Sequence, residues 1–164
     1  MASLHIIDRG DDPHFRIILD VGERAVLQGL PERLETLLLH PDRSPKVIDR
    51  LFPPAHHDPD REREHRELIG STLFEERRES LKAFAATLAI PPDGPLVTLD
   101  VDLATINLWL HVVNDFRLLL ATELGIEDND YHERPPEDPD AYESFVLLEH
   151  LSSLQYMLLE AVSG

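Results

Sequence analysis

The densest group of side chains with metal-binding chemistry lies in the stretch FPPAHHDPDREREH. Imidazole and carboxylate groups suit zinc, iron or manganese. One interpretation is therefore a mononuclear divalent-metal site formed by His56, His57, Asp58 and His65. Glu62 and His65 also form an E-x-x-H pair, whose spacing places both side chains on one face of a helix. Helical di-iron proteins carry two such pairs, and the chain has no second one, so that class of site is excluded.

The same stretch also has the features of an ordinary helix entrance. Asp58 or Asp60 can cap a helix by accepting a hydrogen bond from a free backbone amide, while the histidines pack or face solvent. Adjacent histidines on a proline-rich loop are a weak metal signal, so we favour this structural interpretation. His57 and Asp58 remain the residues to test for a divalent metal, and no other cofactor is expected.

A second group of polar side chains lies on the most apolar predicted helix. Asn107, His111 and Asn114 recur at helical spacing and form a narrow polar stripe. Arg117 falls on the apolar stripe of that helix, and a buried guanidinium needs a carboxylate, so we predict that it is largely buried and paired with an acid. Gln155 lies on the apolar side of the last helix. These side chains form either a polar binding pocket or a hydrogen-bond network that sets the helix register, and we favour the network.

Two kinds of local pattern predict the elements that hold these residues. The runs LHIID and HFRIILD are rich in β-branched residues and flank a turn, which predicts a hairpin over about residues 4–20. Asp20 with Glu23 forms a capping-box pattern at the start of the next helix. Asp102 can cap the apolar helix and Gly125 can end it. A short strand is possible over residues 96–99.

We predict a mainly α fold: a single-domain helical bundle, residues 1–164, around a central apolar helix over about 102–124, with a small N-terminal β-hairpin. An acidic, proline-interrupted loop is expected over about 126–140. Asp128 and Asp130 begin like a calcium loop, but Glu133 and Pro139 stand where that motif needs glycine and a bidentate glutamate. A solvated loop is therefore the favoured interpretation.

Composition limits the classes of function. The chain has 32 acidic and 15 basic residues and a formal net charge of −17, so it repels phosphate backbones and anionic lipids, and neither nucleic acid nor membrane is expected as a partner. It has no cysteine, which excludes disulfides and thiolate catalysis. Motifs for phosphate loops, dinucleotide sites, serine hydrolases and zinc proteases are absent. No secretory signal or long apolar run is visible, so a cytoplasmic protein is expected.

The segments RLFPPAHHDPD, NLWLHVVNDFRLLLATELGI and HLSSLQYMLLEAV together resemble a bacterial family catalogued as a domain of unknown function, number two-zero-one-seven. The most specific element is a W-L-x(3)-N-D-x-R-L run. The resemblance implies a largely helical fold with no established activity. It also implies gene neighbourhoods near the ClpS adaptor of the Clp protease, and thus a link to regulated proteolysis. Similar proteins tend to carry an aromatic at His56 and a large apolar residue at His65, which implies packing roles for both histidines. The candidate binding residues are Trp109, His111, Asn114, Asp115 and Arg117.

Our leading hypothesis is a non-enzymatic binding or regulatory protein that meets a protein partner through a helical groove and an acidic surface. One alternative is a metal-dependent enzyme or sensor that uses the region from His56 to His65. Another is a structural homodimer formed through an exposed face of the last helix.

Overall fold

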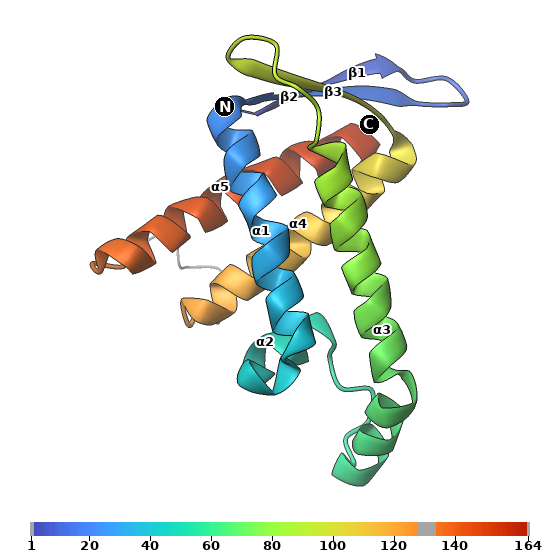
Figure 1. Cartoon of the computed structure of the whole chain (residues 1–164), viewed down its shortest axis with the longest axis vertical. Coiled ribbons are helices and arrows are strands. Elements are labelled where there is room, and N and C mark those ends of the chain that lie inside the picture. Colours follow the sequence, from blue (N-terminus) through green and yellow to red (C-terminus); the bar gives the residue numbers. More distant parts are fainter. Residues whose placement is uncertain (1, 128–133, 164) are drawn as a thin grey trace.

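The computed structural model describes residues 2–127 and 134–163. Within these ranges the chain is mainly helical, with five α-helices and a three-stranded antiparallel sheet (Figure 1). The predicted fold class is thus confirmed at this level. The elements are β1 Ser3–Asp8, β2 His14–Asp20, α1 Val21–Leu39, the 3-10 turn η1 Pro41–Arg43, α2 Pro45–Leu51, α3 Pro59–Thr87, β3 Leu96–Asp102, α4 Leu103–Glu123 and α5 Pro139–Ser163. The candidate calcium residues Asp128 and Asp130 lie outside the described residues.

The sheet has the order β1-β2-β3, with the predicted hairpin as two of its strands. The hairpin prediction was incomplete, because β3 pairs with the whole of β2, from His14 opposite Asp102 to Asp20 opposite Leu96. Alternate residues of β2, namely Phe15, Ile17 and Leu19, are buried. A two-stranded hairpin is only marginally stable in water, so the pairing with the third strand and the packing on the helices supply the additional stability. The sheet lies across one end of the helices (Figure 1).

Two predicted helix starts are confirmed. The Glu23 amide donates to Asp20 Oδ1 at 2.7 Å, and the Asp20 amide donates to Glu23 Oε1 at 3.1 Å, which completes the capping box of α1. Asp102 Oδ1 accepts from the Thr105 amide at 2.9 Å and caps α4. Gly125 follows α4 with a φ of 70°, a conformation that glycine adopts without strain.

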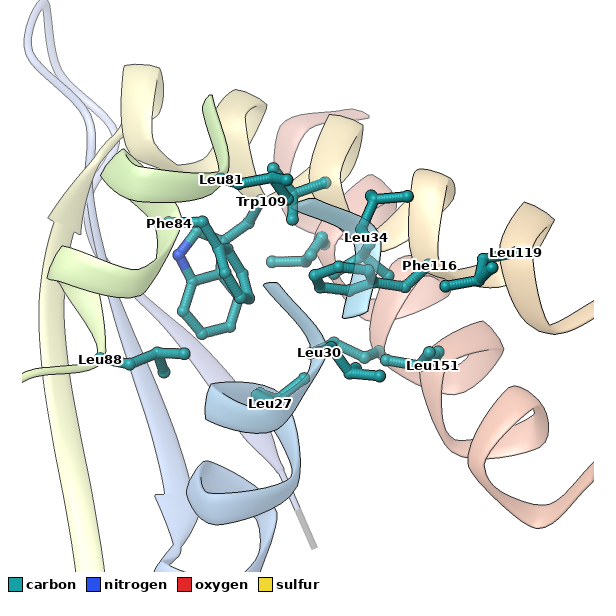
Figure 2. Close-up of a cluster of buried hydrophobic side chains, with 14 of the residues drawn as sticks. Leu27, Leu30, Leu34, Leu81, Phe84, Leu88, Trp109, Phe116, Leu119 and Leu151 are labelled. Carbon is teal, nitrogen blue, oxygen red and sulfur yellow. The ribbon is translucent and has the colours of Figure 1, made fainter. Parts of the chain in front are cut away.

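Four of the helices form two pairs, α1 with α3 and α4 with α5, that cross each other. In Figure 1, α1 and α3 lie roughly along the same axis with opposite chain directions, while α4 and α5 lie side by side across them. Helix α4 contacts α1, α2, α3, α5 and β3, but a bundle arranged around one central helix is not confirmed. Figure 2 shows the core where the pairs meet, with labelled side chains from four helices. These are Leu27, Leu30, Leu34, Leu81, Phe84, Leu88, Trp109, Phe116, Leu119 and Leu151.

Helix α3 contributes fully buried side chains only near its C-terminal end, although Leu73 and Phe74 are partly buried and pack against the core. Its buried residues are Leu81 and Phe84, both near its C-terminal end. The first half projects beyond the rest of the molecule, near α2 (Figure 1). Among the helices of the described residues, none combines the length and the apolar character needed to cross a membrane.

Candidate functional site

An open groove of about 540 Å³ lies between the segment formed by η1 and α2 and the first half of α3. These elements are at the bottom of Figure 1. We call it the α2–α3 groove. Its apolar walls consist of Pro45, Ile48 and Phe52 on one side and Ile69, Leu73 and Phe74 on the other. Because the first half of α3 is not covered by another helix, these apolar side chains line a space that opens to solvent.

Two aromatic rings form the base of the groove. The Phe52 and Phe74 ring centroids are 4.9 Å apart, with the rings tilted by 46°. The Arg77 guanidinium carbon also lies 4.9 Å from the Phe52 ring centroid, a cation–π distance. Phe52 is buried, whereas Phe74 is only partly covered. The Phe52 ring therefore contacts both an aromatic ring of the groove and a cation.

Charged side chains occupy the rim of the groove. Three carboxylates, Asp42, Asp49 and Glu62, and one guanidinium, Arg66, line it. Arg66 Nε donates to Glu62 Oε1 at 3.1 Å, and its Nη2 donates to the Phe52 carbonyl. Asp42 and Asp49 are exposed. Arg66 Nη2 also lies 3.7 Å from Asp49 Oδ1, so the two carboxylates are exposed and Asp49 is ion-paired with Arg66.

Glu62 is tied into the loop before α3. Its Oε2 accepts the backbone amides of Ala55 and His56, each at 2.9 Å. Burial raises the pKa of Glu62, but these amides and Arg66 outweigh it, and the pKa is lowered overall. Glu62 is thus an ionised anchor of the loop, engaged on both of its oxygens.

His56 of this loop, which is exposed, contacts the partly buried His65 of α3. The His56 and His65 rings meet edge to face, with centroids 5.3 Å apart and an interplanar angle of 84°. Asp58 caps α3 by accepting the Asp60 amide at 3.0 Å, so the capping prediction is confirmed. His57 is exposed. Within residues 2–127 and 134–163, no group of three or more histidine or acidic side chains is arranged to hold a metal ion.

The prediction that Arg117 pairs with an acidic side chain is wrong. Arg117 is partly buried, and its hydrogen bonds run to Ser152 Oγ, at 3.1 Å, and to Gln155 Oε1, both on α5. Gln155 Nε2 lies 3.5 Å from Asn114 Oδ1. The hydroxyl and amide groups of α5 satisfy the guanidinium because α4 and α5 lie side by side. This arrangement is the hydrogen-bond network between helices that the sequence favoured, and it joins Asn114 and Arg117.

The other candidate binding residues are separated by the fold. Trp109 is fully buried, and its Nε1 donates to Thr87 Oγ1 at 3.0 Å, at the far end of α3 from the groove. His111 is exposed. The five candidates therefore do not converge on one pocket, although they share one helix.

Asp115 is the residue of that run with the most unusual surroundings. It is 3% exposed, the one charged side chain that is buried in the described part of the chain. Its Oδ1 accepts a hydrogen bond from Arg77 Nη1 of α3, whereas Oδ2 is buried with no hydrogen-bond partner. Burial raises the pKa of Asp115, while the hydrogen bond and charge of Arg77 and the charge of His111 oppose the rise.

Sequence reasoning missed Arg77 as the partner of this acid. A signal for burial was present, because Asp115 falls three residues after Val112 and four before Leu119 and so shares their face of the helix. The choice of cation had no local signal, since Arg77 is 38 residues away along the chain.

A model of the family described as "Domain of unknown function (DUF2017)" matches residues 5–162. Neither the curated proteins nor the solved structures contain a significant match. Because the family match covers almost all of the sequence, the chain belongs to the DUF2017 family.

Proposed function

We propose that the protein is a cytoplasmic, non-enzymatic binding module whose α2–α3 groove receives an amphipathic, positively charged segment of a partner protein. The observation that carries the proposal is an open apolar groove of about 540 Å³ with exposed carboxylates at its rim. Pockets for small molecules typically measure roughly 300–1,000 Å³ and are lined mainly by apolar side chains, a lining that grooves for amphipathic helices share. The groove meets both criteria.

The shape of the groove suits a short helix. Its walls are two helical segments, and the apolar face of an amphipathic helix commonly fills such a space with side chains at spacings of three and four residues. Phe52 and Phe74 at the base, with Ile69 and Leu73 on the wall, offer contacts for those side chains. Apolar contact with these residues would supply most of the affinity.

The charge of the chain favours a basic occupant. Asp42 and Asp49 are exposed at the rim, and the whole chain carries −17. Complementary charge speeds association and rejects partners of like sign. A lysine- or arginine-rich segment is therefore attracted to the groove, while a second copy of this acidic chain is repelled.

Binding fits the groove better than catalysis does. Glu62 is engaged with two backbone amides and Arg66, and His65 packs against His56. Glu62 therefore has both carboxylate oxygens engaged, which leaves the groove without a free carboxylate on α3 to act as a general base.

Two designed peptides test the proposal. One is an amphipathic helical peptide of leucine and lysine, and the other has glutamate in place of every lysine. We expect the lysine peptide to bind with a dissociation constant in the range of about 1–100 μM and the glutamate peptide at least about tenfold more weakly. Calorimetry at two salt concentrations measures both. Equal affinity for the two peptides, or no binding of the lysine peptide, would contradict the proposal.

Neighbouring residues on α3 provide a matched control. Ile69 lines the groove, whereas Leu68 does not and is 81% exposed. Ile69→Glu and Leu68→Glu introduce the same charge on the same turn of the same helix. We expect Ile69→Glu to weaken lysine-peptide binding by about tenfold or more, and Leu68→Glu to have little effect. Equal losses in both variants would place the peptide elsewhere.

The link to Clp-type regulated proteolysis is a narrower form of the same proposal. Its basis is the gene neighbourhood implied by the family resemblance, which gives no mechanism. Purified Clp protease, with and without its ClpS adaptor, can be assayed for degradation of a fluorescent substrate in the presence of this protein. An unchanged rate at all ratios would remove this link and leave the peptide-binding proposal intact.

A second candidate function, a structural homodimer, has one observation in its favour. Helix α5 exposes the apolar or aromatic side chains Tyr142, Val146, Tyr156, Leu159 and Val162. Light scattering at high protein concentration tests it. A dimer that is lost in Tyr156→Glu would support this function, and a monomer would exclude it.

A further inference from the structure

We propose that Asp115 is a positioning residue for the α2–α3 groove: its carboxylate holds Arg77, and Arg77 holds the Phe52 ring at the groove base. The inference rests on the proposed function, because it assigns a role to residues that do not themselves line the groove. It links α4, which lies in the core, to the surface that would meet the partner.

The contacts form a continuous path through three elements. Arg77 Nη1 of α3 donates to Asp115 Oδ1 of α4. The same guanidinium lies 4.9 Å from the Phe52 ring centroid, and Phe52 follows directly after α2. Phe52 in turn lies 4.9 Å from the Phe74 ring in the groove. Each step is a direct contact, so a change at Asp115 reaches the groove through one intermediate side chain.

The backbone of Phe52 is held independently of its ring. Its amide donates to the Ile48 carbonyl at 2.8 Å, and its carbonyl accepts from Arg66 Nη2. The main chain at the groove base is therefore anchored, and what Arg77 adds is the placement of the ring. This separation predicts that loss of Asp115 changes the side-chain geometry of the groove without unravelling the end of α2.

Stability alone does not account for a buried carboxylate at this position. Removing a charge from water is costly, and apolar replacements of buried ion pairs are often as stable or more stable. The burial of Asp115 is also imperfect, because Oδ2 has no hydrogen-bond partner. Unlike an apolar pair, the ion pair fixes a guanidinium within cation–π distance of the Phe52 ring.

Free-protein measurements test the positioning role without any ligand. In Asp115→Asn, we expect the NMR signals of the Phe52 and Phe74 rings and of the Arg77 Nε–H to shift, while those of Phe15 in the sheet stay in place. Arg77→Lys retains the charge but loses the planar group, and we expect it to shift the same rings. If the Phe52 and Phe74 signals are unchanged in both variants, Asp115 does not position the groove.

A double-mutant cycle with the leucine–lysine peptide tests the consequence for binding. Asp115→Asn should weaken binding by about tenfold, and most of this loss should disappear in a Phe52→Leu background, because residues that act through one another are not additive. Leu19→Ala, a core change in β2, should lower stability without changing affinity. Additive effects of Asp115→Asn and Phe52→Leu would overturn the inference. If the wild-type protein does not bind the peptide, the proposed function fails, and the NMR shifts still decide the positioning role.

Discussion

The two halves of α3 have the same backbone and opposite surroundings. In the second half, Leu81 and Phe84 are buried against the other helices, and Phe84 lies 5.0 Å from the Trp109 ring and 5.7 Å from the Phe116 ring. In the first half, apolar side chains such as Ile69 and Leu73 line an open groove, and Leu68 faces solvent. Hydrophobic residues of one helix therefore have two different surroundings, the core and an open groove. Those near the C-terminal end stabilise the fold, whereas those that line the groove are only partly buried, and we propose that they contact a partner.

The largest expected contrast comes from one substitution made at the groove-lining middle of α3 and at its buried C-terminal end. Phe84→Ala should lower the free energy of unfolding by about 3–5 kcal/mol, because a fully buried ring is lost and a cavity remains. Phe74→Ala should cost less, about 1–2 kcal/mol, since its ring is only partly buried and borders an open groove. Urea unfolding followed by the fluorescence of Trp109 measures both. Equal losses of stability in the two variants would mean that the groove-lining part of α3 belongs to the core as fully as its C-terminal end does.

Arg77→Met tests the contact that joins the groove to the core. We expect a loss of about 3 kcal/mol near neutral pH, because the Asp115 carboxylate is left buried without its cation. Burial already raises the pKa of Asp115 against the opposing effect of Arg77, so the variant should raise it further. A raised folded-state pKa means that the folded protein binds the proton more tightly than the unfolded chain does.

The sign of the pH dependence follows from that difference. The contribution of Asp115 is most favourable below the unfolded pKa of about 4, and it is lost as the pH rises through the folded-state pKa. The deficit of Arg77→Met relative to the wild type should therefore shrink as the pH falls towards 4. Urea unfolding at a series of pH values measures it. A deficit that stays constant over this range would show that Asp115 titrates alike in both proteins.

Asp58→Ala separates the two interpretations of the histidine-rich loop. If Asp58 acts as a helix cap, the loss should be about 1 kcal/mol and the same with or without a chelator. If His57 and Asp58 hold a metal, the chelator should destabilise the wild-type protein and have no effect on the variant. Thermal unfolding of protein purified without a histidine tag, with metal analysis of the same sample, distinguishes these outcomes. We expect the first.

The smallest effect is expected at Leu68. Leu68→Ser replaces a side chain that is 81% exposed, so the free energy of unfolding should change by no more than about 0.5 kcal/mol. The groove should keep its affinity for the lysine peptide. A larger loss of stability would indicate that Leu68 is covered in solution, for instance by a second copy of the chain.

Much of the local structure could be predicted from short patterns. The capping box of Asp20 and Glu23, the cap at Asp102, the stop at Gly125 and the cap at Asp58 involve residues within four positions of one another, so the sequence carries the whole interaction. The third strand was predicted only in part, over residues 96–99 of Leu96–Asp102, because its pairing with β2 joins segments about 80 residues apart.

The candidate site was harder to predict for the same reason. The helical spacing of Asn114 and Arg117 pointed to a polar network with Gln155, and the structure contains it. The spacing gave no information about which cation faces Asp115. The groove itself had no signal, because its walls belong to α2 and α3 and its shape depends on how far α3 projects past the core.

The sequence by itself determined the helix caps, the apolar faces, the acidic charge and the family, because each of these is a property of neighbouring residues or of composition. Only the tertiary structure decided that Arg117 meets α5 rather than an acid, that Arg77 meets Asp115, and that half of α3 is left to line a groove. The physical reason is that side-chain partners across crossed helices are chosen by the packing angle and offset of whole elements. No short stretch of sequence specifies that geometry.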